Sequence, residues 1–238
     1  MTTAYAGSGL PDCPVLFLPF AASPNVNWLK APLKRMEPLL SAAGWGHRPI
    51  RLQLGPLRVR TLHVPERIAV FGTPIGQTGV HPIACEVYSN IRAAYACSGA
   101  RHPIVARRPA GHMRAHPAEE ALYDHWRRSG FEVIDGATLS PEEQARAFGS
   151  ASALIGFSGS NLHNSIFCAM GTPVIEIGDR RAASRVEPRN ATQWQISTVL
   201  GQPYRFVSGF HADGHTARTP GDLLDSLAAL DLAEINSV

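Results

Sequence analysis

The sequence predicts a mixed α/β protein whose second half contains a parallel sheet. From about residue 100 onward, short apolar runs alternate with helical patterns of about ten to fifteen residues. Strands separated by such helices form right-handed βαβ units, which bring parallel strands side by side. With 238 residues, 45% of them hydrophobic, the chain is also long enough to bury a substantial core.

The first half, residues 1–100, is expected to form a short and less regular α/β unit. Its expected elements are a strand at 15–20, a helix at 27–43, a hairpin or two strands over 50–64, a loop at 65–80 and a helix at 81–98. Gly44 and Gly99 end the two helices, while Pro32 and Pro38 weaken the first.

The second half, residues 101–238, is expected to form a Rossmann-like layer after a boundary near 99–102. The expected strands are 103–106, 131–134, 153–157, 173–177 and 204–207, and the expected helices are 117–129, one beginning at Ser140, 161–170, 193–200 and 222–230. Several of these helices have capping residues that mark their ends. Ser140 and Pro141 open a helix with an acidic first turn, and Gly130, Gly171 and Gly201 each follow one.

Composition excludes several classes of protein. The net charge of +3 comes from 22 basic and 19 acidic residues without a basic block, so we expect no nucleic-acid partner. No run approaches the roughly 18 apolar residues of a membrane span, and we expect no integral membrane segment. The N-terminus has no signal-peptide pattern and the four cysteines are scattered, so we expect a reducing, cytoplasmic location and no metal site.

The most informative segment follows the apolar strand at 153–157. Ser158, Gly159, Ser160 and Asn161 come directly after it, and a helix is expected to begin there. Free N–H groups at a helix start bind anions, and a glycine lets the backbone approach a phosphate closely. The turn is therefore either a phosphate site or an ordinary strand-to-helix connection with a capping residue.

Two other strand ends carry residues that suit a nucleotide. Glu176 ends a strand and could accept hydrogen bonds from ribose hydroxyls, or it could be solvated or paired with a following arginine. Arg107 and Arg108 follow the strand at 103–106 and could clamp a diphosphate or form surface ion pairs. Carboxyl ends of parallel strands meet at one edge of a sheet, so these residues converge with the 158–161 turn.

The segment from Ser158 to Glu176 reads S-G-S-N-L-H-N-S-I-F-C-A-M-G-T-P-V-I-E. It resembles the pattern "HGAxLxN…F…G…ViE" of glycosyltransferase family 61. The matching residues are Gly159, Leu162, Asn164, Phe167, Gly171 and Glu176. Arg107, Arg114 and the pair Glu119–Glu120 are similar to an arginine-ended strand, a second arginine and an acidic helix. Residues 27–33 lie where the family has "HWLxxxL", and residues 200–204 are similar to its closing leucine-glycine and tyrosine.

The resemblance implies a GT-B-like pair of Rossmann-like domains, residues 1–100 on the acceptor side and 101–238 on the donor side. It implies an inverting bacterial transferase that takes a sugar from a nucleotide donor, usually a UDP-sugar, to a glycan or surface-polysaccharide acceptor such as capsule. We expect no required cofactor and no divalent metal, with a homo-oligomer or a polysaccharide-assembly protein as a further partner. The implied donor-binding residues are Arg107, Arg114, Ser158, Gly159, Ser160, Asn161, Asn164 and Glu176.

Two family histidines are replaced in this chain. Asn27 stands at the histidine of "HW", and Ser158 stands at the histidine of "HG". Asparagine cannot act as a general base at neutral pH, so the base would be another group, with Asp12, His81 and Glu86 as candidates. The alternatives are a catalytically weakened protein that binds sugar nucleotides or glycans, or a nucleotide-sugar epimerase of GT-B shape.

Overall fold

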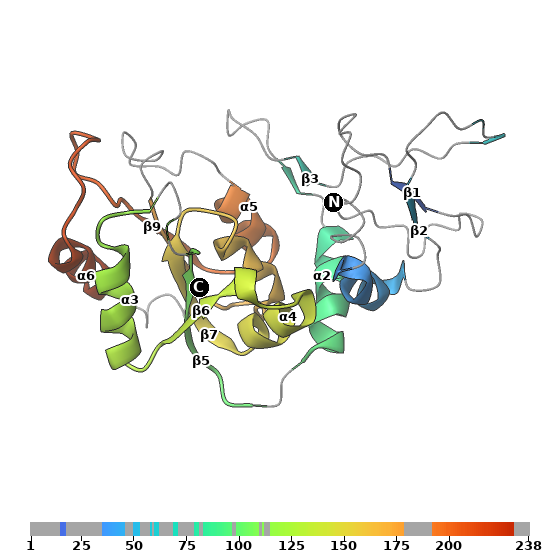
Figure 1. The fold of residues 1–238 in the computed structure, drawn as a ribbon, viewed down its shortest axis with the longest axis horizontal. Helices are drawn as coiled ribbons and strands as arrows, with labels where there is room; N and C mark the ends of the chain where they lie inside the picture. Colours follow the sequence, from blue (N-terminus) through green and yellow to red (C-terminus); the bar gives the residue numbers. More distant parts are fainter. Residues whose placement is uncertain are drawn as a thin grey trace.

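The computed structural model describes part of the chain and includes residues from both halves. The described residues are 15–17, 35–45, 50–52, 58, 60–61, 69–70, 79–80, 83–96, 99–109, 111, 115–178 and 192–230. The ribbon in Figure 1 shows a central sheet flanked by helices, with the residues of the first half to one side of it.

A five-stranded parallel sheet forms the centre of the second half. Its strands are β5 (His102–Arg107), β6 (Glu132–Asp135), β7 (Ala151–Phe157), β8 (Val174–Ile177) and β9 (Tyr204–Val207). They lie in the order β6-β5-β7-β8-β9, and every neighbouring pair is parallel. The mixed α/β fold and the parallel sheet predicted from the sequence are thus confirmed.

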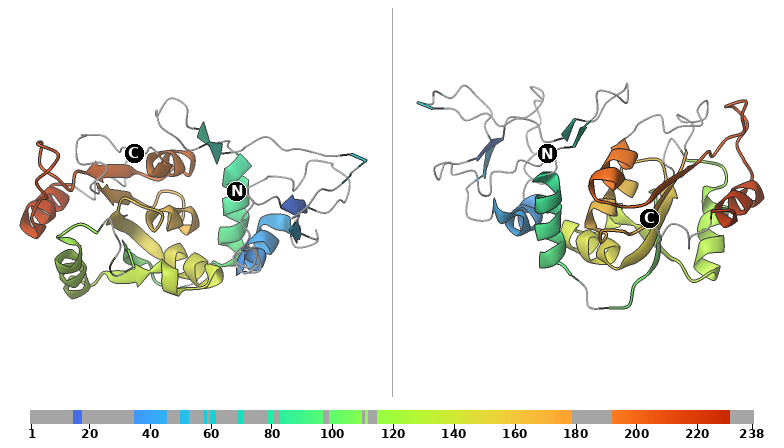
Figure 2. Two further views of the ribbon diagram at one scale, coloured as in Figure 1. Left: turned by 45° about the horizontal axis from the view of Figure 1, so that its top comes forward. Right: turned by 180° about the vertical axis from the view of Figure 1, so that it is seen from behind.

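Helices cover both faces of this sheet. α3 (Glu119–Arg128) and α6 (Pro220–Ala228) lie on one face, while α4 (Pro141–Gly149) and α5 (Thr192–Val199) lie on the other (Figures 1 and 2). Alternate residues of each strand contact opposite layers, as strand geometry requires. Val105 and Ile155 pack with the α3 side, and Ile104 and Leu154 pack with the α4 side.

Local capping explains where several helices begin. Ser140 accepts the N–H of Glu143, and the Glu143 carboxylate accepts the N–H of Ser140, so that α4 opens with a complete capping box. Thr219 and Asp222 form the same arrangement at α6. The helix start predicted at Ser140 is confirmed.

The described parts of the first half form two small sheets and two helical segments. β1 (Val15–Phe17) pairs in parallel with β2 (Ile50–Leu52), and β3 (Ala69–Val70) pairs antiparallel with β4 (Gly79–Val80). Residues 35–40 are α-helical and continue into η1 (Ser41–Trp45), where Gly44 has a φ of 92°. The longer helix is α2 (Ile83–Ala94).

Two expectations for the first half need correction. Residues 65–80 are not entirely a loop, because β3 and β4 pair with each other there. Ala69 pairs with Val80 and Val70 with Gly79, although five of the sixteen residues from 65 to 80 are glycine or proline. Of the stretch 50–64, residues 50–52 form a strand, whereas residues 58, 60 and 61 do not.

The helix expected at 161–170 is also wrong in type and length. The chain there forms η4, a 3-10 helix over Leu162–Phe167 that ends when Cys168 turns extended. Leu162, Ser165 and Cys168 are buried, and their three-residue spacing matches the three residues per turn of a 3-10 helix. A stretch of six residues lacks the aligned peptide dipoles of the longer α-helix that the sequence pattern predicted.

None of the helices in the described residues has both the length and the apolar character required to cross a membrane.

Candidate functional site

The strand order creates a switch point between β5 and β7. From β5 the chain proceeds outward to β6 at one edge, whereas from β7 it proceeds outward through β8 to β9 at the other edge. In open α/β sheets, ligands bind outside the carboxyl ends of the strands at such a point. The residues that follow β5 and β7, Arg107–Arg108 and Ser158–Asn161, therefore lie at the candidate site.

The turn after β7 is held against two neighbouring strands. The backbone N–H of Ser158 donates to the carbonyl of Ile177 in β8 at 2.8 Å. On the other side, the side-chain amide of Asn161 donates to the carbonyl of Ala106 in β5 at 2.8 Å. A Cβ at Gly159 would lie 2.8 Å from Oδ1 of Asn161, so a larger residue there would displace the Asn161 side chain.

Arg107 lies at the edge of the site in a partly exposed ion pair. Its Nη2 donates to both carboxylate oxygens of Glu120, at 3.0 and 3.1 Å, and its guanidinium lies 5.5 Å from the ring centre of Tyr123. The Arg107 side chain is 26% exposed and that of Glu120 is 65% exposed. Exposed ion pairs contribute little to stability, so the pair can open to admit another anion.

Arg108 lies in a different environment from its neighbour. Its side chain is 2% exposed and forms an ion pair at 3.0 Å with Glu119, which is 6% exposed. Its other terminal nitrogen donates to the carbonyl of Ser158, and the guanidinium lies 5.7 Å from the ring centre of Phe157. The expectation that Arg108 clamps a diphosphate at the sheet edge is therefore wrong, because the side chain is buried against protein groups.

Glu119, at the start of α3, accepts hydrogen bonds from two further groups near Arg108. Its Oε1 also accepts the backbone N–H of His116 at 2.8 Å, and its Oε2 accepts the hydroxyl of Tyr123 at 3.3 Å. Burial and the adjacent carboxylate of Glu119 raise the pKa of Tyr123 well above its usual value. The tyrosine is therefore a neutral hydrogen-bond donor.

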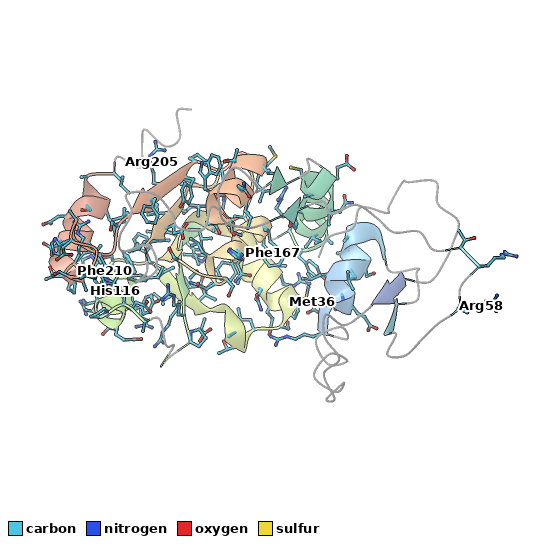
Figure 3. The ribbon with its side chains drawn as sticks, turned by 90° about the horizontal axis from the view of Figure 1, so that it is seen from above. Met36, Arg58, His116, Phe167, Arg205 and Phe210 are labelled. Carbon is cyan, nitrogen blue, oxygen red and sulfur yellow. The ribbon has the colours of Figure 1, made fainter. Side chains whose placement is uncertain are left out.

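His116 connects this cluster to the end of β9. Its Nε2 donates to the carbonyl of Gly209 at 2.7 Å, and its Nδ1 accepts the N–H of Ala118 at 3.1 Å. The ring stacks on Phe157 and forms an edge-to-face contact with Phe210. Figure 3 shows His116 and Phe210 side by side, near α3 and α6. Burial lowers the pKa of His116, so the ring is neutral at neutral pH.

Glu176 is buried at the end of β8 on the opposite face of the sheet from Arg107. Its Oε2 accepts the hydroxyl of Tyr204 at 2.6 Å. Burial, and to a smaller extent the negative charge of Glu176, raises the pKa of Tyr204 above its usual range. One partner of Glu176 is thus a tyrosine on the neighbouring strand β9.

The other predicted donor residues lie close to the turn. Ser160 is exposed, and Asn164 in η4 is half-buried with its amide donating to the carbonyl of Asn161 at 3.1 Å. Among the candidate bases, Glu86 is exposed in the first turn of α2. Asp12, Asn27, His81 and Arg114 lie outside the described residues.

Within the described residues there is no group of three or more metal-ligating side chains. The carboxylate of Asp213, which lies between two histidines in sequence, accepts the N–H groups of His215 and Thr216 at 2.8 and 2.9 Å. The hydroxyl of Thr216, followed by these two N–H groups, lowers the pKa of Asp213 to about 2. The Asp213 carboxylate therefore stabilises the turn formed by the residues that follow it.

Sequence reasoning missed the buried cluster formed by Arg108, Glu119, His116 and Tyr123. One signal could have indicated it, namely that two consecutive arginines at the end of β5 face two consecutive glutamates at the start of the next helix. Pairing each arginine with one glutamate gives the two ion pairs seen here. Sequence alone does not reveal which of the two is buried.

Comparison with known proteins identifies the family. No match was found among curated proteins. The family profile described as Glycosyltransferase 61 matches residues 14–175, more than half of the chain, and so spans β1, the β5 and β7 strand ends and the turn after β7. This chain belongs to glycosyltransferase family 61.

Proposed function

We propose that the protein transfers a sugar from a UDP-sugar to a glycan or surface-polysaccharide acceptor with inversion at the anomeric carbon. Family membership supports glycosyl transfer. The observation that carries the proposed donor site is the β5/β7 switch point with Arg107 and the 158–161 turn beside it. Residues 101–238 would then be the donor domain of a GT-B-like pair, with residues 1–100 on the acceptor side.

The proposed roles follow from charge and position. Arg107 and Arg114 stabilise the departing diphosphate, and Arg107 exchanges Glu120 for phosphate oxygens. The backbone and side chains from Ser158 to Asn161, with Asn164, contact the phosphates. Glu176 would hold the ribose hydroxyls after exchanging the Tyr204 hydroxyl, which its buried carboxylate accepts in this structure. In this scheme arginine supplies the charge that supports the leaving group, and no divalent metal is required.

An acceptor hydroxyl must also lose its proton during inverting transfer. Asn27 cannot take this proton, and Asp12, His81 and Glu86 remain the proposed bases. Each would have to approach the acceptor hydroxyl at the donor site. A fall in kcat on substitution of one of them, with UDP binding unchanged, would assign the role.

The test combines turnover with binding. The purified protein is incubated with a panel of UDP-sugars and glycan acceptors, free UDP is measured, and UDP binding is determined by calorimetry. Arg107→Ala is expected to weaken UDP binding by about 1–3 kcal/mol, as the loss of a charge-assisted bond does. The matched control is Arg127→Ala, which opens an exposed ion pair with Asp124 at the other end of α3 and should leave binding unchanged.

The replaced histidines at positions 27 and 158 favour one alternative, a sugar-nucleotide-binding protein of the same family with weakened catalysis. Micromolar UDP binding without turnover would support that alternative over transfer. A changed sugar in the absence of acceptor would instead indicate epimerase activity. Failure to bind UDP at all would contradict the donor site itself.

A further inference from the structure

We propose that Arg108 is a positioning residue, which holds the 158–161 turn in the geometry that receives the donor phosphates without touching the donor. The inference rests on the proposed function, because it assigns a role within the same donor site. It separates the two consecutive arginines, with Arg107 available to a ligand and Arg108 acting through the protein.

The contacts of Arg108 leave its guanidinium directed at the turn. One terminal nitrogen is fixed by Glu119 at 3.0 Å, and the other donates to the carbonyl of Ser158. Glu119 is itself fixed by the backbone N–H of His116 and the hydroxyl of Tyr123. The fork is therefore oriented from behind by α3 and points at the first residue of the turn.

The turn is held from its other side as well. Asn161 donates to Ala106 at the end of β5, and the N–H of Ser158 donates to Ile177 at the end of β8. Together with Arg108, these bonds attach both ends of the turn to the flanking strands. A hypothetical Cβ on Gly159 would also be 3.7 Å from Nε of Arg108, so the guanidinium packs directly beneath the turn.

Stability alone does not explain a buried ion pair at this place. Removing both charges from water costs free energy, and well-packed apolar residues can replace such pairs with no loss of stability. A planar fork with two aimed donors does something that an apolar pair cannot do, because it fixes the direction of a backbone carbonyl. Fixing a backbone before the ligand arrives reduces the entropy lost on binding.

Lysine is the informative replacement. Arg108→Lys keeps the positive charge for Glu119, but a single ammonium on a flexible stem lacks the planar fork that joins Glu119 to Ser158. Glu119→Gln keeps the shape and an acceptor oxygen while removing the charge that orients the guanidinium. The matched controls are Arg127→Lys and Asp124→Asn, in the exposed ion pair of the same helix.

Two measurements on the full chain distinguish positioning from a merely structural role. In Arg108→Lys, we expect faster hydrogen–deuterium exchange in the peptide spanning residues 158–168 and a UDP Kd raised about tenfold, equivalent to about 1.4 kcal/mol. Glu119→Gln should change both in the same direction, and the controls should change neither. A merely structural role would lower the Tm and leave the UDP Kd of the folded protein unchanged.

The outcomes separate the two proposals. Wild-type protein that binds UDP, with Arg108→Lys binding equally well, would overturn the positioning role alone. Faster exchange without a change in Kd would also overturn it. Wild-type protein that fails to bind UDP would overturn the proposed function and this inference together. If Arg108→Lys does not fold, Glu119→Gln provides the same pair of readouts.

Discussion

At the scale of single residues, neighbours in sequence occupy opposite environments. Arg107 and Arg108 both pair with glutamates of α3, yet one side chain is 26% exposed and the other 2% exposed. A partly exposed guanidinium can exchange its partner for a ligand, whereas a buried one would leave an uncompensated charge behind. The chemistry of the site thus depends on burial as much as on residue type.

His116 gives a residue-scale prediction about pH. Its pKa lies below the ordinary 6.5 in the folded protein because of burial, the largest of the causes. Below pH 6.5 the imidazole of His116 is protonated in the unfolded chain but stays neutral in the folded protein. The free energy of unfolding therefore falls as pH falls toward the folded pKa of His116. Within that window the slope approaches about 1.4 kcal/mol per pH unit for one histidine.

The measurement is urea denaturation between pH 7.5 and 5. His163 has a pKa lowered by burial too and contributes in the same direction. His116→Gln should therefore reduce the slope only in part, and adding His163→Gln should reduce it further. Asn90→Ala, an exposed control in α2, should not change it. A slope unaffected by both core substitutions would contradict the assignment.

At the scale of elements, the strands and capped helices of the second half were predictable, whereas the segment after β7 was not. Apolar runs identify strands directly, and the sequence from Ser140 to Glu143 carries its own capping signal. The 3-10 form of η4 cannot be predicted from its sequence, because the run from Leu162 to Phe167 suits either helix type. Long-range bonds accompany this form, such as that from the amide of Gln193 to the hydroxyl of Ser165.

The capping box of α4 yields a prediction at this scale. Ser140→Ala removes the acceptor for the N–H of Glu143 and is expected to cost about 1 kcal/mol of stability. For a chain of this length, that corresponds to a fall in Tm of about 2–4 °C. Ser140→Asn retains a capping oxygen and should restore most of the loss. Equal losses in both variants would show that the cap is not the cause.

At the scale of the whole molecule, side chains from the two halves share one hydrophobic cluster. Leu39, Val87 and Ile91 from the first half are buried with Phe148 and Leu154 from the second. The sequence predicts that α2 is a helix, but it does not predict that α2 packs against α4. The residues that make this contact are far apart along the chain. The position of the candidate site was predictable from strand ends, whereas the burial of Arg108 required the packed structure.

The shared cluster predicts that the described elements of both halves unfold together. Ile91 is buried in α2, and Ile91→Ala is expected to destabilise the protein by about 2–5 kcal/mol through lost burial and a residual cavity. Hydrogen exchange should then accelerate in β5 and β7 as well as in α2, within a single denaturation transition. Asn90→Ala, on the exposed side of α2, is the control and should stay within about 0.5 kcal/mol of wild type. Loss of protection confined to α2 would show instead that the sheet is stable without it, since the strands would then draw their stability from α3, α4, α5 and α6.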